Sequence, residues 1–149
     1  MNVEILWNKH LSEWIEFEGM IRFKTRSIPS ENDLYKPNYR SKHMYKNPEI
    51  GGYQDDFIEL GKKTDLIKVR DYVDKWSEIR VEFHFYLRSN RKIWGLDVTN
   101  MVKATEDALK DITKIDDSKH KSVTSEKYES EDEYESVKVV YRMKLKDEA

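Results

Sequence analysis

The fold of this chain is constrained most by an alternating segment that is followed by an amphipathic one. Between residues 79 and 87 the odd positions are all apolar and the even positions are polar or mixed, which is typical of a strand with one buried face. From residue 98 to residue 112 the apolar residues instead recur at i, i+3, i+4 and i+7, which predicts a helix. Residues 137–145 alternate again and predict a strand near the C-terminus.

Two earlier segments carry weaker patterns. Apolar residues at odd positions between Ile15 and Phe23 predict a strand, with a bulge or bend at Gly19. Residues 53–76 have apolar residues at three- to four-residue steps and predict a helix. We expect this helix to break near Gly61 and to restart with Thr64 as its N-cap.

The order of these segments predicts an α+β domain. We expect residues 122–128 to be the hairpin partner of the strand at 137–145. The result is a small, mostly antiparallel sheet with two main helices packed on it. At 149 residues the chain has the length of one domain, 1–149, with residues 1–14 as an N-terminal extension.

Composition excludes several classes of protein. With 27 Lys and Arg against 29 Asp and Glu, the formal charge of −2 excludes a globally basic nucleic-acid binder but not a locally basic one. The absence of Cys excludes disulfides and thiolate metal sites. No apolar run approaches the ~20 residues of a membrane-spanning helix, and no basic segment followed by an apolar one opens the chain. We therefore expect a cytoplasmic protein without membrane contact.

Charge is unevenly distributed along the chain. Residues 21–50 carry a net charge of +4, all three prolines and several tyrosines, so we expect an irregular loop whose basic residues contact phosphates and whose tyrosines stack on bases. The alternative is a solvated loop whose tyrosines pack on the domain. Residues 126–135 hold six acids against Lys127, and we expect a solvated hairpin tip that points away from any DNA.

Potentially catalytic residues flank the helix at 98–112. Asp97 precedes it, Lys103 lies on its non-core face, and Asp116 and Asp117 follow it. Hydrolysis of a phosphodiester needs hard cations held by carboxylates, and a nearby Lys can stabilise charge on the phosphate. These residues can form such a site only if the chain after the helix folds back. Otherwise Asp97 is an ordinary N-cap, the Asp pair an ordinary turn and Lys103 a solvated side chain.

The same residues carry a resemblance to a known family. The run from Asp97 to Lys103, the Asp-Ala-Leu at 107–109 and the pair Asp116-Asp117 resemble the signature of the RusA-like crossover-junction endodeoxyribonucleases. That signature reads D-x-D-N-x-x-K, then D-A-L, then D-D after the helix. The resemblance implies a homodimeric Holliday junction resolvase that nicks four-way or other branched DNA with Mg²⁺, or with Mn²⁺ as a substitute.

Carried over by position, the resemblance makes Asp97 and Asp117 metal-binding catalytic carboxylates and Lys103 the catalytic lysine, with Asp116 beside them. Thr99 stands where the family has its second Asp. A Thr hydroxyl can bind the metal or a metal-bound water but adds no charge. The alternative is therefore a branched-DNA-binding protein whose catalysis is weakened or lost.

Basic residues near these segments are the expected DNA contacts. They are Arg26, Lys36, Arg40, Lys42, Arg88, Arg91 and Lys92. A third hypothesis has no role for nucleic acid: the acidic segment at 126–135 would recruit a protein partner.

Overall fold

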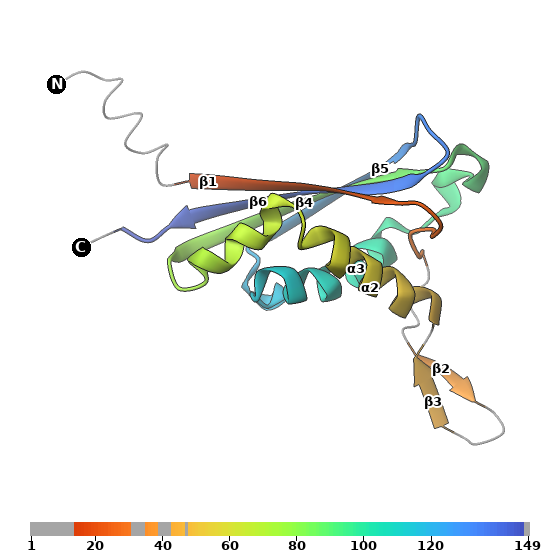
Figure 1. Ribbon diagram of the computed structural model, residues 1–149, viewed down its shortest axis with the longest axis horizontal. Helices are drawn as coiled ribbons and strands as arrows, with labels where there is room; N and C mark the ends of the chain where they lie inside the picture. Colours follow the sequence, from red (N-terminus) through yellow and green to blue (C-terminus); the bar gives the residue numbers. More distant parts are fainter. Residues whose placement is uncertain (1–13, 31–34, 39–42, 47, 148–149) are drawn as a thin grey trace.

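The computed structural model describes residues 14–30, 35–38, 43–46 and 48–147 (Figure 1). The elements, in chain order, are β1 (Trp14–Phe23), β2 (Tyr35–Asn38), β3 (His43–Lys46), α2 (Pro48–Gly61), η1 (Asp65–Tyr72), β4 (Trp76–Leu87), η2 (Ser89–Arg91), η3 (Ile93–Gly95), α3 (Val98–Thr113), η4 (Asp117–Lys119), β5 (Ser122–Glu129) and β6 (Glu135–Leu145). The elements labelled η are 3₁₀ turns. No helix in these described ranges is long and apolar enough to cross a membrane.

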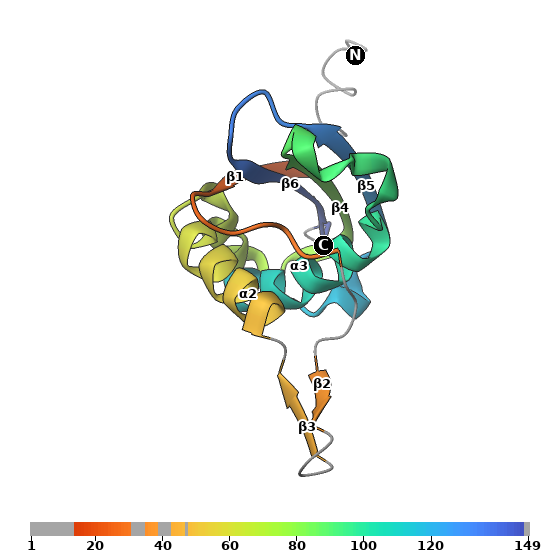
Figure 2. The same cartoon turned by 90° about the vertical axis from the view of Figure 1, so that its right-hand side faces the viewer.

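The predicted α+β class is confirmed. Strands β1, β6, β4 and β5 form one sheet in that order, and α2 and α3 lie together against one of its faces (Figures 1 and 2). The β1–β6 and β6–β4 pairings are antiparallel, whereas β4 and β5 run parallel. The core fills the space between sheet and helices with side chains such as Phe83, Phe85, Tyr141, Leu109 and Ile112.

The predicted hairpin between residues 122–128 and 137–145 is wrong, because β4 lies between β5 and β6. Strand β6 buries Val137, Val139, Tyr141 and Met143, so it takes a central place with a neighbour on each side. Strand β5 has no fully buried residue and occupies an edge. The five-residue connection from β5 to β6 therefore crosses the end of β4.

Strand β1 is continuous, and the predicted bulge or bend at Gly19 is absent. Gly19 pairs directly with Val139 in an unbroken register. A Cβ at this position would lie 2.6 Å from Leu66 Cδ1 and 2.7 Å from Thr64 Oγ1. The glycine therefore allows the start of η1 to approach the strand closely.

The predicted break in the helix at 53–76 is confirmed, with Thr64 as the cap. The Thr64 hydroxyl accepts a hydrogen bond from Leu66 N at 3.2 Å. Three details differ from the prediction. The segment after the break is a 3₁₀ turn, and Trp76 already belongs to β4. Helix α2 also begins at Pro48, because proline suits the first turn, where a helix has no use for the missing N–H.

The basic stretch is partly regular, which the sequence did not predict. Its central part forms the antiparallel pair β2–β3, which projects away from the sheet and helices (Figure 2). Tyrosines favour strands, and an isolated two-stranded pair tolerates a proline such as Pro37. Of the predicted DNA contacts here, Lys36 lies on β2, whereas Arg40 and Lys42 fall outside the described residues, as do residues 1–13 of the predicted extension.

Candidate active site

Helix α3 positions the residues of the resemblance, starting with Asp97 at its N-cap. The Asp97 carboxylate accepts a hydrogen bond from Thr99 N at 2.9 Å. Asn100, in the first turn, donates to the carbonyl of Ser30 at 2.8 Å and holds the loop after β1 against the helix. Asp97 therefore acts as a helix cap, one of the two roles that the sequence left open.

A group of charged side chains lies further along the exposed side of α3. Lys103 and Asp107 are one helical turn apart. The pKa of Asp107 is raised above its ordinary value, first by partial burial and then by the negative charge of Asp117, whereas Lys103 acts in the opposite direction. Glu106 and Asp116 raise it further. The chain after α3 therefore brings Asp117 back toward Asp107.

Asp107 was missing from the predicted site. The signal was present in the sequence, since Asp107 opens the Asp-Ala-Leu segment and follows Lys103 by four residues. That segment belongs to the pattern that resembles the family, and the resemblance does not make Asp107 a metal ligand. Among the charged groups that shift the pKa of Asp107, Asp117 has the largest effect.

Asp116 has local partners of its own. It accepts a hydrogen bond from Ser118 Oγ at 2.7 Å and lies 3.5 Å from Lys110 Nζ. The hydrogen bond from Ser118, followed by the charge of Lys110, lowers the pKa of Asp116. Asp116 is therefore held ionised at the last turn of α3.

His120 fixes the turn that carries Asp117. Its side chain is buried between Glu106, at 3.2 Å, and the hydroxyl of Tyr141, at 2.9 Å. Its backbone N–H also donates to the carbonyl of Asp117 at 3.0 Å. The turn η4 is thus tied to both α3 and β6, so the backbone at Asp117 has a defined position.

The four predicted metal ligands do not form one cluster in the chain. Asp97 and Thr99 lie at the start of α3, and Asp107 lies ten residues after Asp97, about 15 Å along the helix axis. Asp116 lies beside Lys110 and Asp117 beside Asp107, both in the later part of the helix. Within the described ranges no three Asp, Glu or His side chains are arranged to hold a metal ion. Along α3, Asp107 therefore lies one turn from Lys103 and about 15 Å from Asp97, and the charge of Asp117 acts on its carboxyl group.

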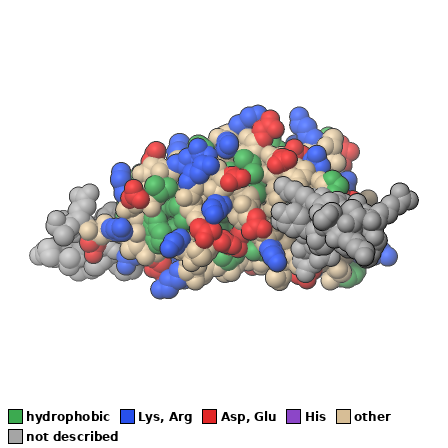
Figure 3. All heavy atoms as spheres, turned by 90° about the horizontal axis from the view of Figure 1, so that it is seen from below, with side chains coloured by type: hydrophobic (Ala, Val, Ile, Leu, Met, Phe, Trp, Pro, Cys, Tyr) green, Lys and Arg blue, Asp and Glu red, His purple; other side chains and the backbone are tan. Residues whose placement is uncertain are grey.

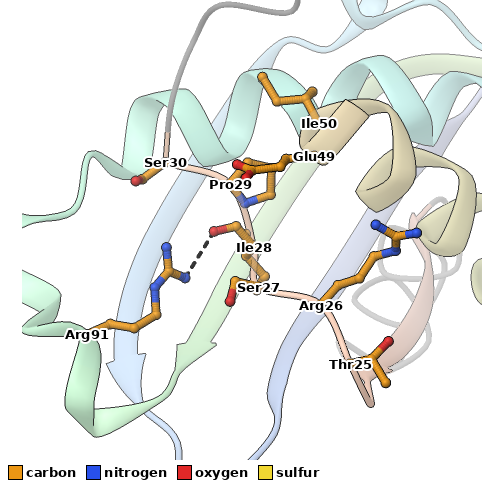
Figure 4. A pocket seen from close by; sticks show the side chains of 9 residues that line it. All are labelled: Thr25, Arg26, Ser27, Ile28, Pro29, Ser30, Glu49, Ile50 and Arg91. Carbon is orange, nitrogen blue, oxygen red and sulfur yellow. Dashed lines mark hydrogen bonds between the residues drawn. The ribbon is translucent and has the colours of Figure 1, made fainter. Parts of the chain in front are cut away.

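Two arginines predicted to bind DNA, Arg88 and Arg91, lie near a second carboxylate, that of Glu135. Glu135 is 1% exposed and accepts hydrogen bonds from Ile28 N at 2.7 Å and Arg88 N at 2.9 Å. The Arg91 guanidinium pairs with the same carboxylate at 2.7 Å and also donates to the carbonyl of Ile28 (Figure 4). The expected solvated acidic segment is therefore wrong for Glu135, because its charge is fully paired inside the fold.

The other basic side chains at this end of the molecule differ in whether they are free to contact a phosphate. Arg26 pairs with Asp56 at 2.5 Å, and Arg88 donates to the Ser27 hydroxyl. Lys92 is exposed, in the left-handed backbone region, and among the described residues its side chain forms no hydrogen bond or ion pair. Seen from the side of the helices, Lys and Arg are intermixed with Asp and Glu (Figure 3).

A polar cavity of about 350 Å³ lies beside the Glu135 pairing (Figure 4). Residues 25–30 form one wall, and Glu49, Ile50 and Arg91 complete it. Because Arg26 and Arg91 are both paired with carboxylates, the cavity has little free positive charge.

No family model matches the chain, and no curated protein matches it. The resemblance to RusA-like nucleases therefore rests on the segments 97–103, 107–109 and 116–117.

Proposed function

We propose that this protein is a divalent-metal-dependent endonuclease that acts on four-way (Holliday) junctions or other branched DNA. The observation that carries the proposal is the group formed by Lys103, Asp107 and Asp117 on the open side of α3. These residues belong to the segment that resembles the RusA-like signature. Two carboxylates that repel one another beside a lysine form an arrangement that a divalent cation and a phosphate would complete.

The donor set fits a hydrated Mg²⁺ ion, with Mn²⁺ as a substitute. Mg²⁺ is usually bound by one or two carboxylates and keeps several waters, and Asp107 and Asp117 offer two carboxylates. Asp116 is close enough to both to add negative potential. When bound, the ion would supply neutralisation of the phosphate and an acidified water. Asp97 and Thr99 lie too far along α3 to join Asp107 in this set.

The residues of the chain have separate roles in this proposal. Lys103, one turn before Asp107, supplies positive charge for a phosphate oxygen as negative charge develops on it. His120 and Glu106 position Asp117 through η4. Lys92, exposed in the turn before α3, and the basic residues of the β2–β3 segment supply contacts to the DNA backbone.

We further propose that the protein acts as a homodimer. A four-way junction has two equivalent strands, and a two-fold dimer presents two equivalent sites. A chain with a net charge of −2 also gains affinity for DNA when two sets of local basic residues act together.

The test is a nicking assay on four-way, forked and linear duplexes with and without MgCl₂. Asp117→Asn and Asp107→Asn should each lower the cleavage rate of the four-way junction by at least about 100-fold, since a change beside a metal ligand already costs 10- to 100-fold. Binding of the junction in EDTA should remain. Asp55→Asn removes an exposed carboxylate of α2 and is the matched control. Cleavage that survives both site variants, or falls equally in the control, would contradict the proposal.

A second candidate function is a branched-DNA-binding protein without catalysis. The separation of Asp97 from Asp107 favours it, because the first part of the signature, with Thr99 in place of an Asp, contributes no carboxylate to the Lys103 group. In that case the wild-type protein binds four-way junctions with a steep dependence on salt but does not cut them. Thr99→Asp would then produce cleavage in an inactive parent. Cleavage by the wild-type protein would exclude this candidate.

A further inference from the structure

A groove lies beside the turn between β5 and β6, on the face of the sheet opposite α2 and α3. Figure 1 shows that turn at the end of the sheet. The groove has a volume of about 480 Å³ and draws side chains from all four strands. They are Met20 of β1, Ser136 of β6, Tyr86 of β4 and Tyr128 of β5. None of these residues takes part in the proposed active site.

The floor of the groove is aromatic and apolar. In the sheet Tyr86 lies directly opposite Tyr128 on one side and Ser136 on the other. The two tyrosine rings stack with their centroids 5.0 Å apart and their planes at 20°. Met20 is 54% exposed, which is unusual for a large apolar side chain on a strand. A flat group that enters the groove therefore meets ring faces and a thioether.

The rim of the groove is acidic. Glu129, Glu131 and Asp132 line it, and Asp132 pairs with Arg22 at 3.3 Å. Glu129 and Glu131 form no ion pair with any described residue. The Tyr128 hydroxyl donates to Glu126 at 2.5 Å, and this hydrogen bond, together with the charge of that carboxylate, raises the pKa of Tyr128 to about 12. The groove therefore has a negative potential with two free carboxylates at its edge.

This combination selects one kind of ligand. A phosphate backbone would be repelled by the rim. A metal ion would pair with the carboxylates through oxygen ligands and leave the aromatic floor without a partner. A purely apolar ligand would desolvate the carboxylates without pairing them. A guanidinium satisfies both parts, because it stacks on aromatic faces and binds carboxylates through two parallel hydrogen bonds.

We propose that this groove docks an arginine-bearing segment of a protein partner. The guanidinium lies on the Tyr86–Tyr128 stack and pairs with Glu129 or Glu131, while the alkyl stem of the arginine contacts Met20. The acidic turn then has a binding role of its own, on a different face from the proposed nuclease site. This inference does not depend on the proposed nuclease function.

The test uses the full-length protein labelled with ¹⁵N and a blocked pentapeptide that has two arginines among glycines. Amide signals of residues 84–88 and 128–136 should shift on titration with this peptide. A matching peptide with two lysines should bind about two- to fivefold more weakly, because lysine is a point charge and lacks the planar stacking surface. Tyr86→Leu should weaken the binding of the arginine peptide by a similar factor, about two- to fivefold.

Charge variants complete the test. Glu131→Lys reverses the charge of an exposed turn residue that has no ion pair. It should weaken the binding of the arginine peptide about two- to fivefold or more. Glu59→Lys makes the same change on exposed α2 and should leave the affinity unchanged. Four results would overturn the proposal. The first is that no signal shifts at millimolar peptide. The second is that the lysine peptide binds as tightly as the arginine peptide while Tyr86→Leu binds the arginine peptide as tightly as the wild type does. The third and fourth are that MgCl₂ alone, or a higher protein concentration without peptide, causes the same shifts.

Discussion

Glu135 lies beside predicted DNA contacts and Asp107 beside predicted catalytic residues, and the charges of these two carboxylates are balanced in opposite ways. Glu135 is buried and receives two backbone N–H groups and the Arg91 guanidinium. Asp107 is exposed and meets the negative charges of Asp117, Glu106 and Asp116, with Lys103 in opposition. The charge of the first carboxylate is balanced within the fold, whereas the second faces more negative than positive charge among the groups that shift its pKa.

The difference separates residues that build the framework from residues that are available to a ligand. The Glu135 carboxylate joins the loop after β1, the end of β4 and the start of β6, and it uses the positive charge of Arg91 to do so. A guanidinium held in this way is a poor phosphate contact. Uncompensated, accessible charge of the kind near Asp107 is more typical of functional sites.

Removing the Glu135 carboxylate is expected to have the largest effect on stability. Glu135→Ala leaves the partly buried Arg91 guanidinium without its partner and leaves the N–H groups of Ile28 and Arg88 without an acceptor. Loss of one partner of a buried pair costs about 3–5 kcal/mol, and we expect a decrease of that size in the free energy of unfolding. Urea denaturation followed by circular dichroism measures it.

Glu133→Ala is the control, since Glu133 lies exposed in the same acidic turn and should change stability by less than about 0.5 kcal/mol. Equal effects of the two variants would show that Glu135 is not an internal pairing residue.

A second prediction sharpens the role of Asp97. Because its carboxylate caps α3, Asp97→Ala should lower the free energy of unfolding by about 1 kcal/mol. Asp97→Asn keeps an acceptor at the cap and should retain most of the stability while it removes the charge. Thermal unfolding of the two variants in EDTA separates the cap from any metal-binding role. If Asp97→Ala leaves stability unchanged, the cap has no energetic importance.

The elements that the sequence predicted well are those with a local signal. The alternation at 79–87 and the amphipathic pattern at 98–112 each depend only on neighbours in the chain, and β4 and α3 match them. The break at Gly61 and the cap at Thr64 are local in the same sense. Local periodicity indicates which side of an element is buried, so the core face of α3 was also predictable.

The features that the sequence did not predict depend on distant parts of the chain. The insertion of β4 between β5 and β6 depends on which strands bury both faces, and alternation in one strand does not report its neighbours. Glu135 looked like one more acid in a charged run, because its partners Ile28 and Arg91 are 107 and 44 residues away. Whether Asp97 meets Asp117 depends likewise on the path after α3, which spacing alone does not fix.

The smallest expected effect concerns the electrostatics of Asp107 in EDTA. Its pKa in the folded state lies above the unfolded value, so protonation favours the folded protein. The resulting stability is fully present below the ordinary value of 3.8 and is lost as the pH rises through the raised pKa. Asp107→Asn removes this loss, and at pH 7 it should raise the free energy of unfolding by no more than about 0.5 kcal/mol.

Mg²⁺ provides the complementary measurement for the same variant. A cation that binds the folded state stabilises it, so MgCl₂ should raise the Tm of the wild-type protein at pH 7. Asp107→Asn should reduce this gain, because the two carboxylates no longer both attract the ion. Glu59→Gln, on exposed α2, should keep the full gain. If Mg²⁺ stabilises Asp107→Asn as strongly as the wild type, the repulsion between Asp107 and Asp117 is not what the ion relieves, and the metal must bind elsewhere.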